Sequence, residues 1–414
     1  MKLSEDLTWR GLIKDKTFGN PKWLDKAGTF YWGVDCSADS LTIGNLAPLL
    51  LARRLADSGW KAILLVGGAT SLIGDPGGKD QERPLLPRET VQKNVESIKS
   101  QVGQLFFGQQ FILVDNYHWL KDVRYLDFLR EFGKHFSVTE LIQRDFISER
   151  IGEHGAGISY AEFSYSLIQG YDYWQLHKTH QANLQIGGSD QWGNMLSGVS
   201  LIRKKEYMQV HAMSMPLLVN KTTGRKFGKS ESGSVWLDAS KTSPTQFYQF
   251  WMNSEDADVE DYLKIFTFLS KEEIQGLISK QKSAPQERPA QTALAHEITK
   301  LVHGKEAVNF SESITEYLTG RRPIENANQE EINEIRQALP NLTVNAGTPV
   351  VEVLVQSGLA VSNSEARRLS QSKAVYINDR QLEKDHLESG DFKNGRLMLR
   401  RGKAYKDSAL IELA

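Results

Sequence analysis

The segment from Cys36 to Gly44 is a loop of small residues, which we expect to follow a strand and to enter a helix at Gly44-Asn45. The N-terminus of a helix offers free N–H groups and a positive dipole end, so phosphate binds well there. Ser37, Thr42 and Asn45 add neutral hydrogen-bond donors, and Gly44 would let a flat base approach the backbone closely. A simple strand-to-helix turn with a capped helix explains the same residues about equally well.

Two further segments combine cations with glycine. Lys79 and Arg83 follow the glycine-containing run 74–78, and they could close over a phosphate chain as charge develops on it; a solvated charged loop is the alternative. The run Lys226-Phe227-Gly228-Lys229-Ser230 adds two lysines and a hydroxyl. It is not a Walker A loop, because Thr223 rather than glycine lies five positions before Gly228. Three phosphate-compatible loops together favour a nucleotide site.

A predicted helix around Tyr165 carries three polar side chains on one face. Tyr165, Gln169 and Asp172 are spaced i, i+4 and i+7, so they share that face. The face could line a pocket in which a hydroxyl, an amide and a carboxylate bind the ammonium and hydroxyl groups of an amino acid. The alternative is a surface helix whose polar face meets water.

The run 185–194 predicts a short strand that ends in two glycines, and a carboxylate lies next to these glycines in the sequence. Asp190 follows Gly187-Gly188, and an acid at the carboxyl end of a parallel strand often accepts hydrogen bonds from ribose hydroxyls. A turn with a capping Ser189 or Asp190 is equally compatible with this run.

The elements that must position these residues form an α/β pattern. Residues 30–35 and 61–66 are apolar and predict strands, and the apolar spacing over 45–58 predicts the helix between them. This unit predicts a doubly wound parallel sheet of the Rossmann type. Helical patterns then dominate residues 243–317, and a small α+β unit follows from Thr348.

The bulk composition bounds the class of protein. The 414 residues predict two or three domains, and 50 basic against 51 acidic residues leave a net charge of −1, so any RNA-binding surface must be a local patch. Cys36 is the single cysteine, which suits a reducing compartment. The first residues are charged and lack the apolar segment of a signal peptide, and the apolar runs of the chain are too short to span a bilayer. We therefore expect a cytoplasmic protein.

Taken together, these segments resemble the bacterial tyrosyl-tRNA synthetases, a family of class I synthetases. The resemblance covers nearly the whole chain. Its most telling pieces are Tyr31-x-Gly33-x-Asp35, Ala38-Asp39-Ser40-Leu41, the run 66–76, Phe163-Ser164-Tyr165, the run 185–194, Lys226-Phe227-Gly228-Lys229-Ser230 and Ser243-Pro244 through Phe250-Trp251.

The resemblance implies a domain order and a reaction. It implies a Rossmann-like catalytic domain over 1–235 with an inserted dimerisation region near 120–160, a helical domain facing the anticodon stem over 236–325, a linker over 326–346 and a small RNA-binding domain over 347–414. The implied reaction joins tyrosine to ATP as tyrosyl-adenylate, and then transfers tyrosine to the terminal ribose of its tRNA. Mg²⁺ would be carried mainly by the ATP phosphates, with no dedicated metal-ligand cluster.

The resemblance also assigns roles to residues. Tyr31 and Asp172 would hydrogen-bond the phenol of tyrosine. The other tyrosine-binding residues would be Asp35, Asp75, Tyr165, Gln169, Gln185 and Gln191. ATP would be bound by Gly33, Gly44, Asn45, Gly188, Asp190 and Lys229. The catalytic groups would be Ser37, Thr42, Asn45, Lys79, Arg83, Lys226, Lys229 and Ser230.

The sequence departs from the family at its first signature, His-x-Gly-His, whose place residues 42–45 take. Thr42 and Asn45 replace the two histidines there and cannot carry an imidazolium charge. Trp32 replaces a residue that is a small cysteine in many relatives. An RNA-binding paralogue without activation activity and a tryptophan-specific sister enzyme therefore stay as alternatives. RNA contacts in the C-terminal module would come from Arg367, Arg368, Arg400, Arg401 and Lys403.

Overall fold

The computed structural model describes residues 1–75, 85–152, 155, 157–219, 221, 227, 229–230, 233–378, 380–402 and 407–414, with the backbone alone at 145, 146, 229 and 230. The chain divides into two compact units. The first contains Met1–Lys241 and Ser254–Leu294, and the second contains Thr242–Asn253 and Ala295–Ala414. The predicted helical domain over 236–325 is therefore shared between the two units.

The first unit is built on a five-stranded parallel sheet with the strand order β3-β2-β1-β4-β5. The register pairs Trp32 of β1 with Leu64 of β2 and with Ile186 of β4. Its strands are β1 (Thr29–Asp35), β2 (Lys61–Gly67), β3 (Phe111–Asp115), β4 (Leu184–Gly188) and β5 (His211–Met215).

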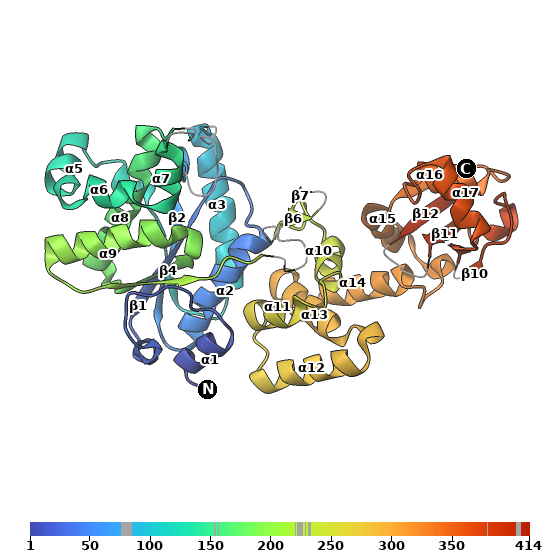
Figure 1. The fold of residues 1–414 in the computed structure, drawn as a ribbon, viewed down its shortest axis with the longest axis horizontal. Helices are drawn as coiled ribbons and strands as arrows, with labels where there is room; N and C mark the ends of the chain where they lie inside the picture. Colours follow the sequence, from blue (N-terminus) through green and yellow to red (C-terminus); the bar gives the residue numbers. More distant parts are fainter. Residues whose placement is uncertain are drawn as a thin grey trace. The chain divides into compact units, whose positions relative to one another are not determined.

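The strand order gives the sheet a switch point between β1 and β4. From β1 the chain proceeds outward through β2 to β3, whereas β4 and β5 extend the sheet in the opposite direction. The helices α2 and α3 cover one face and α8 and α9 the other (Figure 1). Such switch points bind ligands beyond the carboxyl ends of the strands, so the predicted doubly wound fold is confirmed together with its natural binding crevice.

Most helices of the first unit lie in the crossovers between strands and in one long insertion between β3 and β4. The crossover and insertion helices are α2 (Ile43–Asp57), α3 (Arg88–Leu105), α4 (Tyr117–Leu120), α5 (Tyr125–Glu131), α6 (Val138–Ile142), α7 (Asp145–Ile151), α8 (Tyr160–His180) and α9 (Trp192–Glu206). The others are α1 (Leu3–Trp9), α11 (Val259–Phe266), α12 (Lys271–Ser283) and the first part of α13 (Pro289–His303). The short pair β6 (Lys229–Ser230) and β7 (Gly233–Ser234) follows β5 in the chain.

The second unit joins a helical part to a small mixed sheet. The sheet has the order β10-β9-β11-β12-β8, with β12 and β8 parallel and the other pairs antiparallel. Its strands are β8 (Asn341–Val344), β9 (Val375–Ile377), β10 (Arg380–Gln381), β11 (Arg396–Arg401) and β12 (Ser408–Leu413). Its helices are α10 (Pro244–Met252), α14 (Lys305–Leu318), α15 (Gln329–Ala338), α16 (Val350–Gln356), α17 (Asn363–Gln371) and the end of α13.

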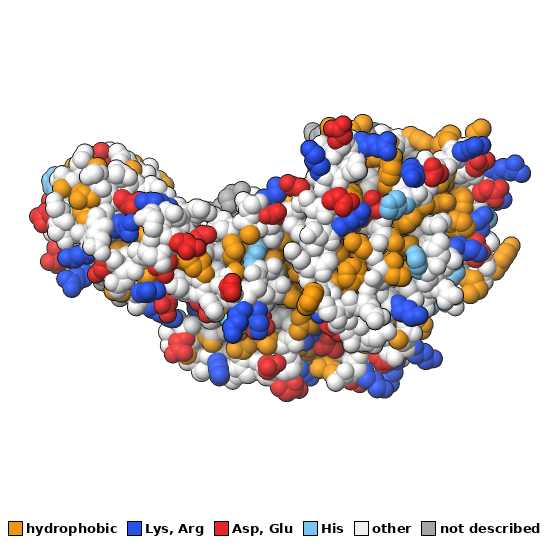
Figure 2. Space-filling model, turned by 180° about the vertical axis from the view of Figure 1, so that it is seen from behind, with side chains coloured by type: hydrophobic (Ala, Val, Ile, Leu, Met, Phe, Trp, Pro, Cys, Tyr) orange, Lys and Arg blue, Asp and Glu red, His pale blue; other side chains and the backbone are white. Residues whose placement is uncertain are grey.

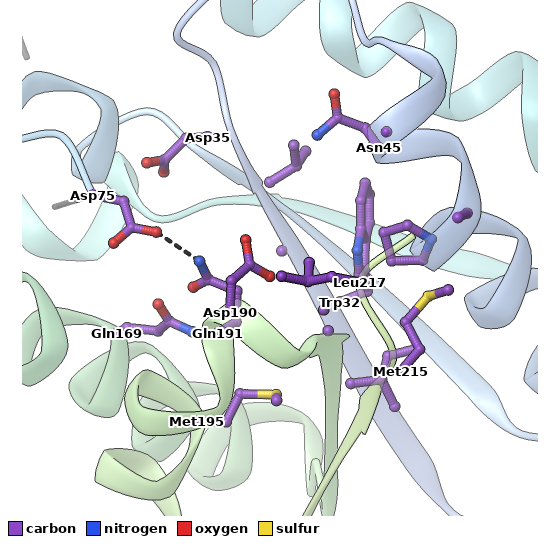
Figure 3. Close-up of a pocket in the computed structure, with 18 of the residues that line it drawn as sticks. Trp32, Asp35, Asn45, Asp75, Gln169, Asp190, Gln191, Met195, Met215 and Leu217 are labelled. Carbon is purple, nitrogen blue, oxygen red and sulfur yellow. Dashed lines mark hydrogen bonds between the residues drawn. The ribbon is translucent and has the colours of Figure 1, made fainter. Parts of the chain in front are cut away.

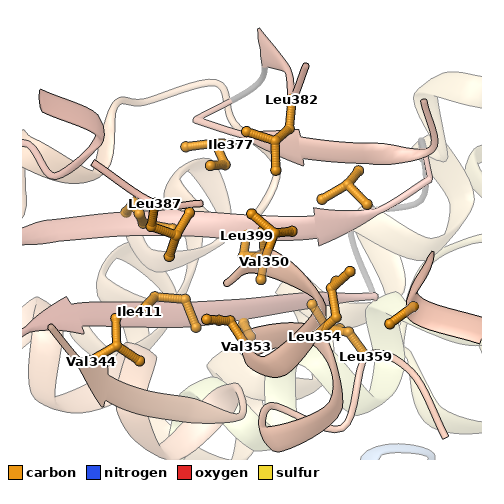
Figure 4. Close-up of a cluster of buried hydrophobic side chains, with 14 of the residues drawn as sticks. Val344, Val350, Val353, Leu354, Leu359, Ile377, Leu382, Leu387, Leu399 and Ile411 are labelled. Carbon is orange, nitrogen blue, oxygen red and sulfur yellow. The ribbon is translucent and has the colours of Figure 1, made fainter. Parts of the chain in front are cut away.

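The two faces of this second sheet contribute to different cores, because successive side chains along a strand point to opposite faces. Leu399 and Ile411 belong to a core with Val353 and Leu354 of α16 (Figure 4). Leu410, which follows Ala409 on β12, faces the other way and joins a second core with residues of α14 and α15.

The segment 326–346, which we expected to be a linker, is folded into this unit. It contains α15 and β8, and β8 pairs with β12. Ile332 and Ile335 of α15 are fully buried, and Arg336 donates two hydrogen bonds of 2.8 Å to Glu412. The polar composition of the segment hid two buried isoleucines at helical spacing, so the prediction of a linker was wrong.

Among the residues that the structure describes, no helix is both long enough and apolar enough to cross a membrane.

Candidate active site

A cavity of about 590 Å³ opens at the switch point of the first sheet, where β1 and β4 end. Its walls come from β1, the start of α2, α8, β4 and the segment 215–218 after β5. Fifteen of the predicted site residues line it: Tyr31, Gly33, Asp35, Ser37, Thr42, Gly44, Asn45, Asp75, Tyr165, Gln169, Asp172, Gln185, Gly188, Asp190 and Gln191.

The structure does not place the side chains of the predicted cationic residues of the site. Lys79, Arg83 and Lys226 lie outside the described residues, as do the side chains of Lys229 and Ser230. Nearby residues of the second cationic loop nevertheless reach the cavity, because Phe227 and Ser234 both line it. The backbone after β7 also pairs with the first signature, where Ile43 N–H donates to the carbonyl of Val235 over 3.1 Å.

The deep end of the cavity combines a phenol and a carboxylate. Tyr31 of β1 and Asp172 of α8 are each 2% exposed, and α8 turns its polar face, with Tyr165 and Gln169, into the same cavity. The alternative of a solvent-facing polar helix is therefore excluded. Among the described residues, none forms a hydrogen bond with the Tyr31 hydroxyl, and the same holds for Oε1 of Gln185. Buried polar atoms of this kind normally have partners, so they point to a polar ligand.

Burial governs the protonation of these groups. It raises the pKa of Asp172 to about 7, although hydrogen bonds from Asn116 and Trp119 act in the opposite direction. Burial, reinforced by the nearby Asp172 carboxylate, also holds the pKa of Tyr31 well above its ordinary value. The Tyr31 phenol is therefore a neutral donor and acceptor at neutral pH, while Asp172 is poised between its two forms.

Two residues that sequence reasoning missed hold the Asp172 carboxylate. Asn116 Nδ2 donates to Asp172 Oδ2 over 3.0 Å, and Trp119 Nε1 donates to Asp172 Oδ1 over 2.8 Å. Asn116 directly follows β3, so a polar side chain at the carboxyl end of a predicted strand was the available signal. Trp119 offered none, because its partner lies 53 residues further along the chain.

The middle of the cavity is a hydrogen-bonded carboxylate network. Asp35 accepts from Thr70 Oγ1 over 2.7 Å and from the Tyr165 hydroxyl over 2.9 Å. Gln191 Nε2 donates to Asp75 Oδ2 over 2.6 Å (Figure 3). A Cβ atom at Gly67 would lie 2.4 Å from Asp35 Oδ1, so only glycine allows Asp35 this position. The network can receive an ammonium group and orient a carboxylate.

The other end of the cavity combines a helix N-terminus with apolar walls. Asn45 Oδ1 accepts from the N–H of Thr42 over 3.0 Å and from its hydroxyl over 2.9 Å, which closes the first turn of α2. Apolar side chains that were not among the predicted site residues surround this end: Trp32, Ala47, Pro48, Met215 and Leu217. An apolar slot beside a helix N-terminus suits the base and phosphates of a nucleotide.

The fold gives the predicted RNA-binding arginines different degrees of exposure. Arg367 and Arg368 are exposed on α17, and Arg401 is half-buried beside Glu365 and Asp407. Arg400 disagrees with the expectation of a surface contact, because it is buried with its guanidinium 5.2 Å from the centre of the Tyr376 ring. Lys403 lies outside the described residues.

Comparison with known sequences matches this chain over nearly its whole length. A family model described as class I tRNA synthetases (W and Y) covers residues 25–318, and one described as the tyrosine–tRNA ligase SYY-like C-terminal domain covers 331–406. The tyrosine–tRNA ligase of Geobacillus kaustophilus is 44% identical, covering 97% of this chain and 98% of that protein. The tyrosine–tRNA ligase of Neisseria meningitidis is 45% identical, covering 92% and 90%.

Comparison with solved structures agrees with the sequence matches. A C-terminally truncated mitochondrial tyrosyl-tRNA synthetase of Aspergillus nidulans is 31% identical with a TM-score of 0.68, covering 77% of this chain and 94% of that one. The chain thus belongs to the class I tRNA synthetases for tyrosine and tryptophan, and within them to the bacterial-type tyrosine–tRNA ligases.

Proposed function

We propose that the cavity binds tyrosine at its Tyr31 and Asp172 end and ATP at its α2 end, and that it joins them as tyrosyl-adenylate before transfer to tRNA. The observation that carries this assignment is the buried Tyr31 hydroxyl, which has no partner among the described residues and lies in one cavity with the anchored Asp172 carboxylate. A phenol hydroxyl can donate to Asp172 and accept from Tyr31 at the same time. Neither tryptophan nor phenylalanine offers that pair of hydrogen bonds.

The polar middle of the cavity would hold the two charged ends of the amino acid. The ammonium group would lie among Asp75, Tyr165 and Gln169. Gln191 and Asp35 would lie next to the carboxylate, whose oxygen must approach the α-phosphorus of ATP. Fixing the reacting groups within contact distance raises their effective concentration. This lowers the activation free energy by roughly 7–11 kcal/mol at best, so positioning alone supplies much of the acceleration.

In the first step a carboxylate oxygen of tyrosine bonds to the α-phosphorus, and the bond from that phosphorus to the bridging oxygen breaks. Pyrophosphate leaves with the electron pair and with Mg²⁺, which enters as part of the ATP substrate. The N-terminus of α2, with Thr42 and Asn45, would face the phosphates. The cationic pairs Lys79 with Arg83 and Lys226 with Lys229 would neutralise the departing charge.

In the second step a hydroxyl of the terminal ribose of tRNA attacks the tyrosyl carbonyl carbon, and the bond from that carbon to the phosphate oxygen of AMP breaks. AMP departs with the electron pair, and the hydroxyl proton passes to the departing phosphate. No covalent bond to the protein is needed. We propose that residues 1–235 carry this chemistry, that the helical region 236–325 faces the anticodon stem, and that the terminal module binds RNA through Arg367 and Arg368, which are exposed on α17.

Exchange of labelled pyrophosphate into ATP tests the proposal, run separately with tyrosine, tryptophan and phenylalanine. We expect exchange with tyrosine and at least 10⁴-fold less with phenylalanine, a magnitude for which the tyrosyl enzymes are themselves the standard example. Tyr31→Phe should lower kcat/KM for tyrosine more than that for phenylalanine. Exchange with tryptophan alone would assign the chain to the sister enzymes, and exchange with none of the three would leave an RNA-binding paralogue.

We also propose a symmetric dimer built on the inserted helices. Large apolar side chains are open to the surface of the first unit, and some of them lie on α5 and α6 (Figure 2). Tyr125 is 60% exposed, Leu126 76% and Val138 59%. Leu126→Asp should convert a dimer into monomers in light scattering, whereas Phe107→Asp, at an equally exposed position after α3, should not. A monomeric unmodified chain at micromolar concentration would contradict the proposal.

A further inference from the structure

A chain of buried hydrogen bonds runs from α8 through the first turn of α9 to the amide of Gln191. Ser166 of α8 and Asn194 of α9 are 1% and 3% exposed, and neither lines the cavity. The Ser166 hydroxyl donates to Asn194 Oδ1 over 2.6 Å, and Asn194 Nδ2 donates to Gln191 Oε1 over 3.2 Å. The chain ends in the cavity, where Gln191 Nε2 donates to Asp75 (Figure 3).

The partners in this chain decide its direction. The oxygen and the NH2 group of an amide have nearly the same shape, so a buried amide is oriented by its hydrogen bonds. A carboxylate only accepts, so the NH2 group of Gln191 must face Asp75 and its oxygen must face Asn194. Asn194 must then present its own NH2 group to Gln191, and its oxygen accepts from the hydroxyl of Ser166. Each donor in the chain therefore points toward the cavity.

Burial keeps the Gln191 amide in this orientation. Hydrogen bonds in a row polarise one another, and a buried amide that loses its partner is destabilised, so Gln191 cannot turn over without breaking the link to Asn194. Gln191 Nε2 has two hydrogens, and Asp75 accepts one of them. Among the described residues none accepts the second hydrogen, which is therefore available to a ligand in the cavity.

We propose that Asn194, held by Ser166, is a positioning residue that fixes the Gln191 amide as a hydrogen-bond donor to the carboxylate of tyrosine during adenylate formation. This inference rests on the proposed function, in which Gln191 lies next to that carboxylate. The carboxylate and the α-phosphate offer only acceptors, so the oxygen of a reversed Gln191 amide would repel them. A donor that is fixed in advance does not have to reorganise as negative charge shifts toward the phosphate.

The test is tyrosine-dependent pyrophosphate exchange by the full chain, measured as kcat/KM for tyrosine. Asn194→Asp keeps the side-chain shape and the bond from Ser166, but it places an oxygen against the oxygen of Gln191 and so favours the reversed amide. We expect this variant to lower kcat/KM about 10- to 100-fold. Ser166→Ala removes only the outer link of the chain and should lower kcat/KM about 3- to 10-fold.

A double-mutant cycle separates positioning of Gln191 from support of the fold. In a Gln191→Ala background the amide is absent, so Asn194→Asp and Ser166→Ala should each change kcat/KM by less than about twofold. Asn183→Asp is the matched control, because Asn183 precedes β4, accepts from the N–H of Thr29 over 3.0 Å and lies outside the cavity. This control should leave kcat/KM within about twofold of its parent in both backgrounds.

An equal loss from Asn194→Asp with and without the Gln191 amide would overturn the inference, because Asn194 would then act on the fold alone. An unchanged kcat/KM in Asn194→Asp would overturn it as well. If Asn194→Asp does not fold, Ser166→Ala carries the same cycle with the loss of a single oxygen atom. The absence of tyrosine-dependent exchange in the wild type would instead refute the proposed function, so the two failures are distinguishable.

Discussion

The carboxylate of Asp172 is fixed before any ligand arrives. Asn116 and Trp119 each donate to one of its oxygens, and Asn116 also donates to Thr70, which in turn donates to Asp35. A continuous chain of hydrogen bonds thus joins the phenol end of the cavity to its centre. Such a network holds the Asp172 carboxylate in one position, so this acceptor does not have to reorganise when a ligand enters the cavity.

This fixed carboxylate predicts a pH dependence of stability. Burial raises the pKa of Asp172 to about 7 from a value near 3.8 in the unfolded chain. The folded state therefore holds a proton that the unfolded state releases, and stability from this group is complete below about pH 4 and is lost as pH rises to about 7. Three pKa units correspond to roughly 4 kcal/mol as an upper bound.

Asp172→Asn isolates the effect because an amide does not titrate. In urea unfolding of the first unit, the free energy of unfolding of Asp172→Asn relative to the wild type should rise between pH 4 and pH 7 and then level off. A difference that is constant over this range would show that Asp172 is already ionised in the folded protein at pH 4.

At the scale of elements, α8 and α9 must approach closely for the cavity to form. A Cβ atom at Gly198 of α9 would lie 2.6 Å from the Cβ atom of Tyr173 on α8, which real contacts do not allow. Tyr173 is fully buried and its hydroxyl donates to the carbonyl of His211 over 2.7 Å, so it cannot turn away without losing that bond. Asp172 precedes Tyr173, and any shift of α8 therefore moves the Asp172 carboxylate in the cavity.

Gly198→Ala should destabilise the first unit by about 1–3 kcal/mol and raise KM for tyrosine, because the two helices must separate. Gly103→Ala is the control: a Cβ atom at Gly103 of α3 meets nothing within 4 Å, so alanine should stabilise that helix by roughly 0.5–1 kcal/mol. Thermal unfolding and exchange kinetics measure both variants. Equal stability of Gly198→Ala and the wild type would mean that the close crossing of α8 and α9 is not rigid.

The same elements explain what could be predicted from the sequence. The strands β1, β2 and β4 follow from short apolar runs, and the polar face of α8 follows from its helical spacing, whereas β5 was not predicted. Asn116 and Trp119 could not be assigned, since their role exists only when the insertion after β3 folds back on α8. The predictions of a surface contact for Arg400 and of a linker around α15 were wrong for a related reason. Composition describes how polar a segment is, whereas burial depends on its distant partners.

The cavity and the small mixed sheet lie in different compact units of the chain. Every residue that lines the cavity belongs to the first unit. In the second unit Leu410 of β12 is fully buried in one core with Ile314 and Tyr317 of α14 and Ile332 of α15. This core ties the terminal sheet to the helical part, so damage to it should reach the terminal module without reaching the cavity.

Leu410→Ala should therefore cost the second unit about 2–5 kcal/mol of stability, the usual effect of a cavity left by a buried leucine. Amide hydrogen exchange should become faster in β8 and α15, while tyrosine-dependent pyrophosphate exchange at 25 °C should stay within about twofold of the wild type. Charging of tRNA should fall more than pyrophosphate exchange if the second unit binds RNA. Val361→Ala, at a position that is 89% exposed in the same unit, should change neither measurement. A parallel loss of pyrophosphate exchange in Leu410→Ala would show that the units are coupled, and unchanged protection of β8 would show that the terminal module is not held by this core.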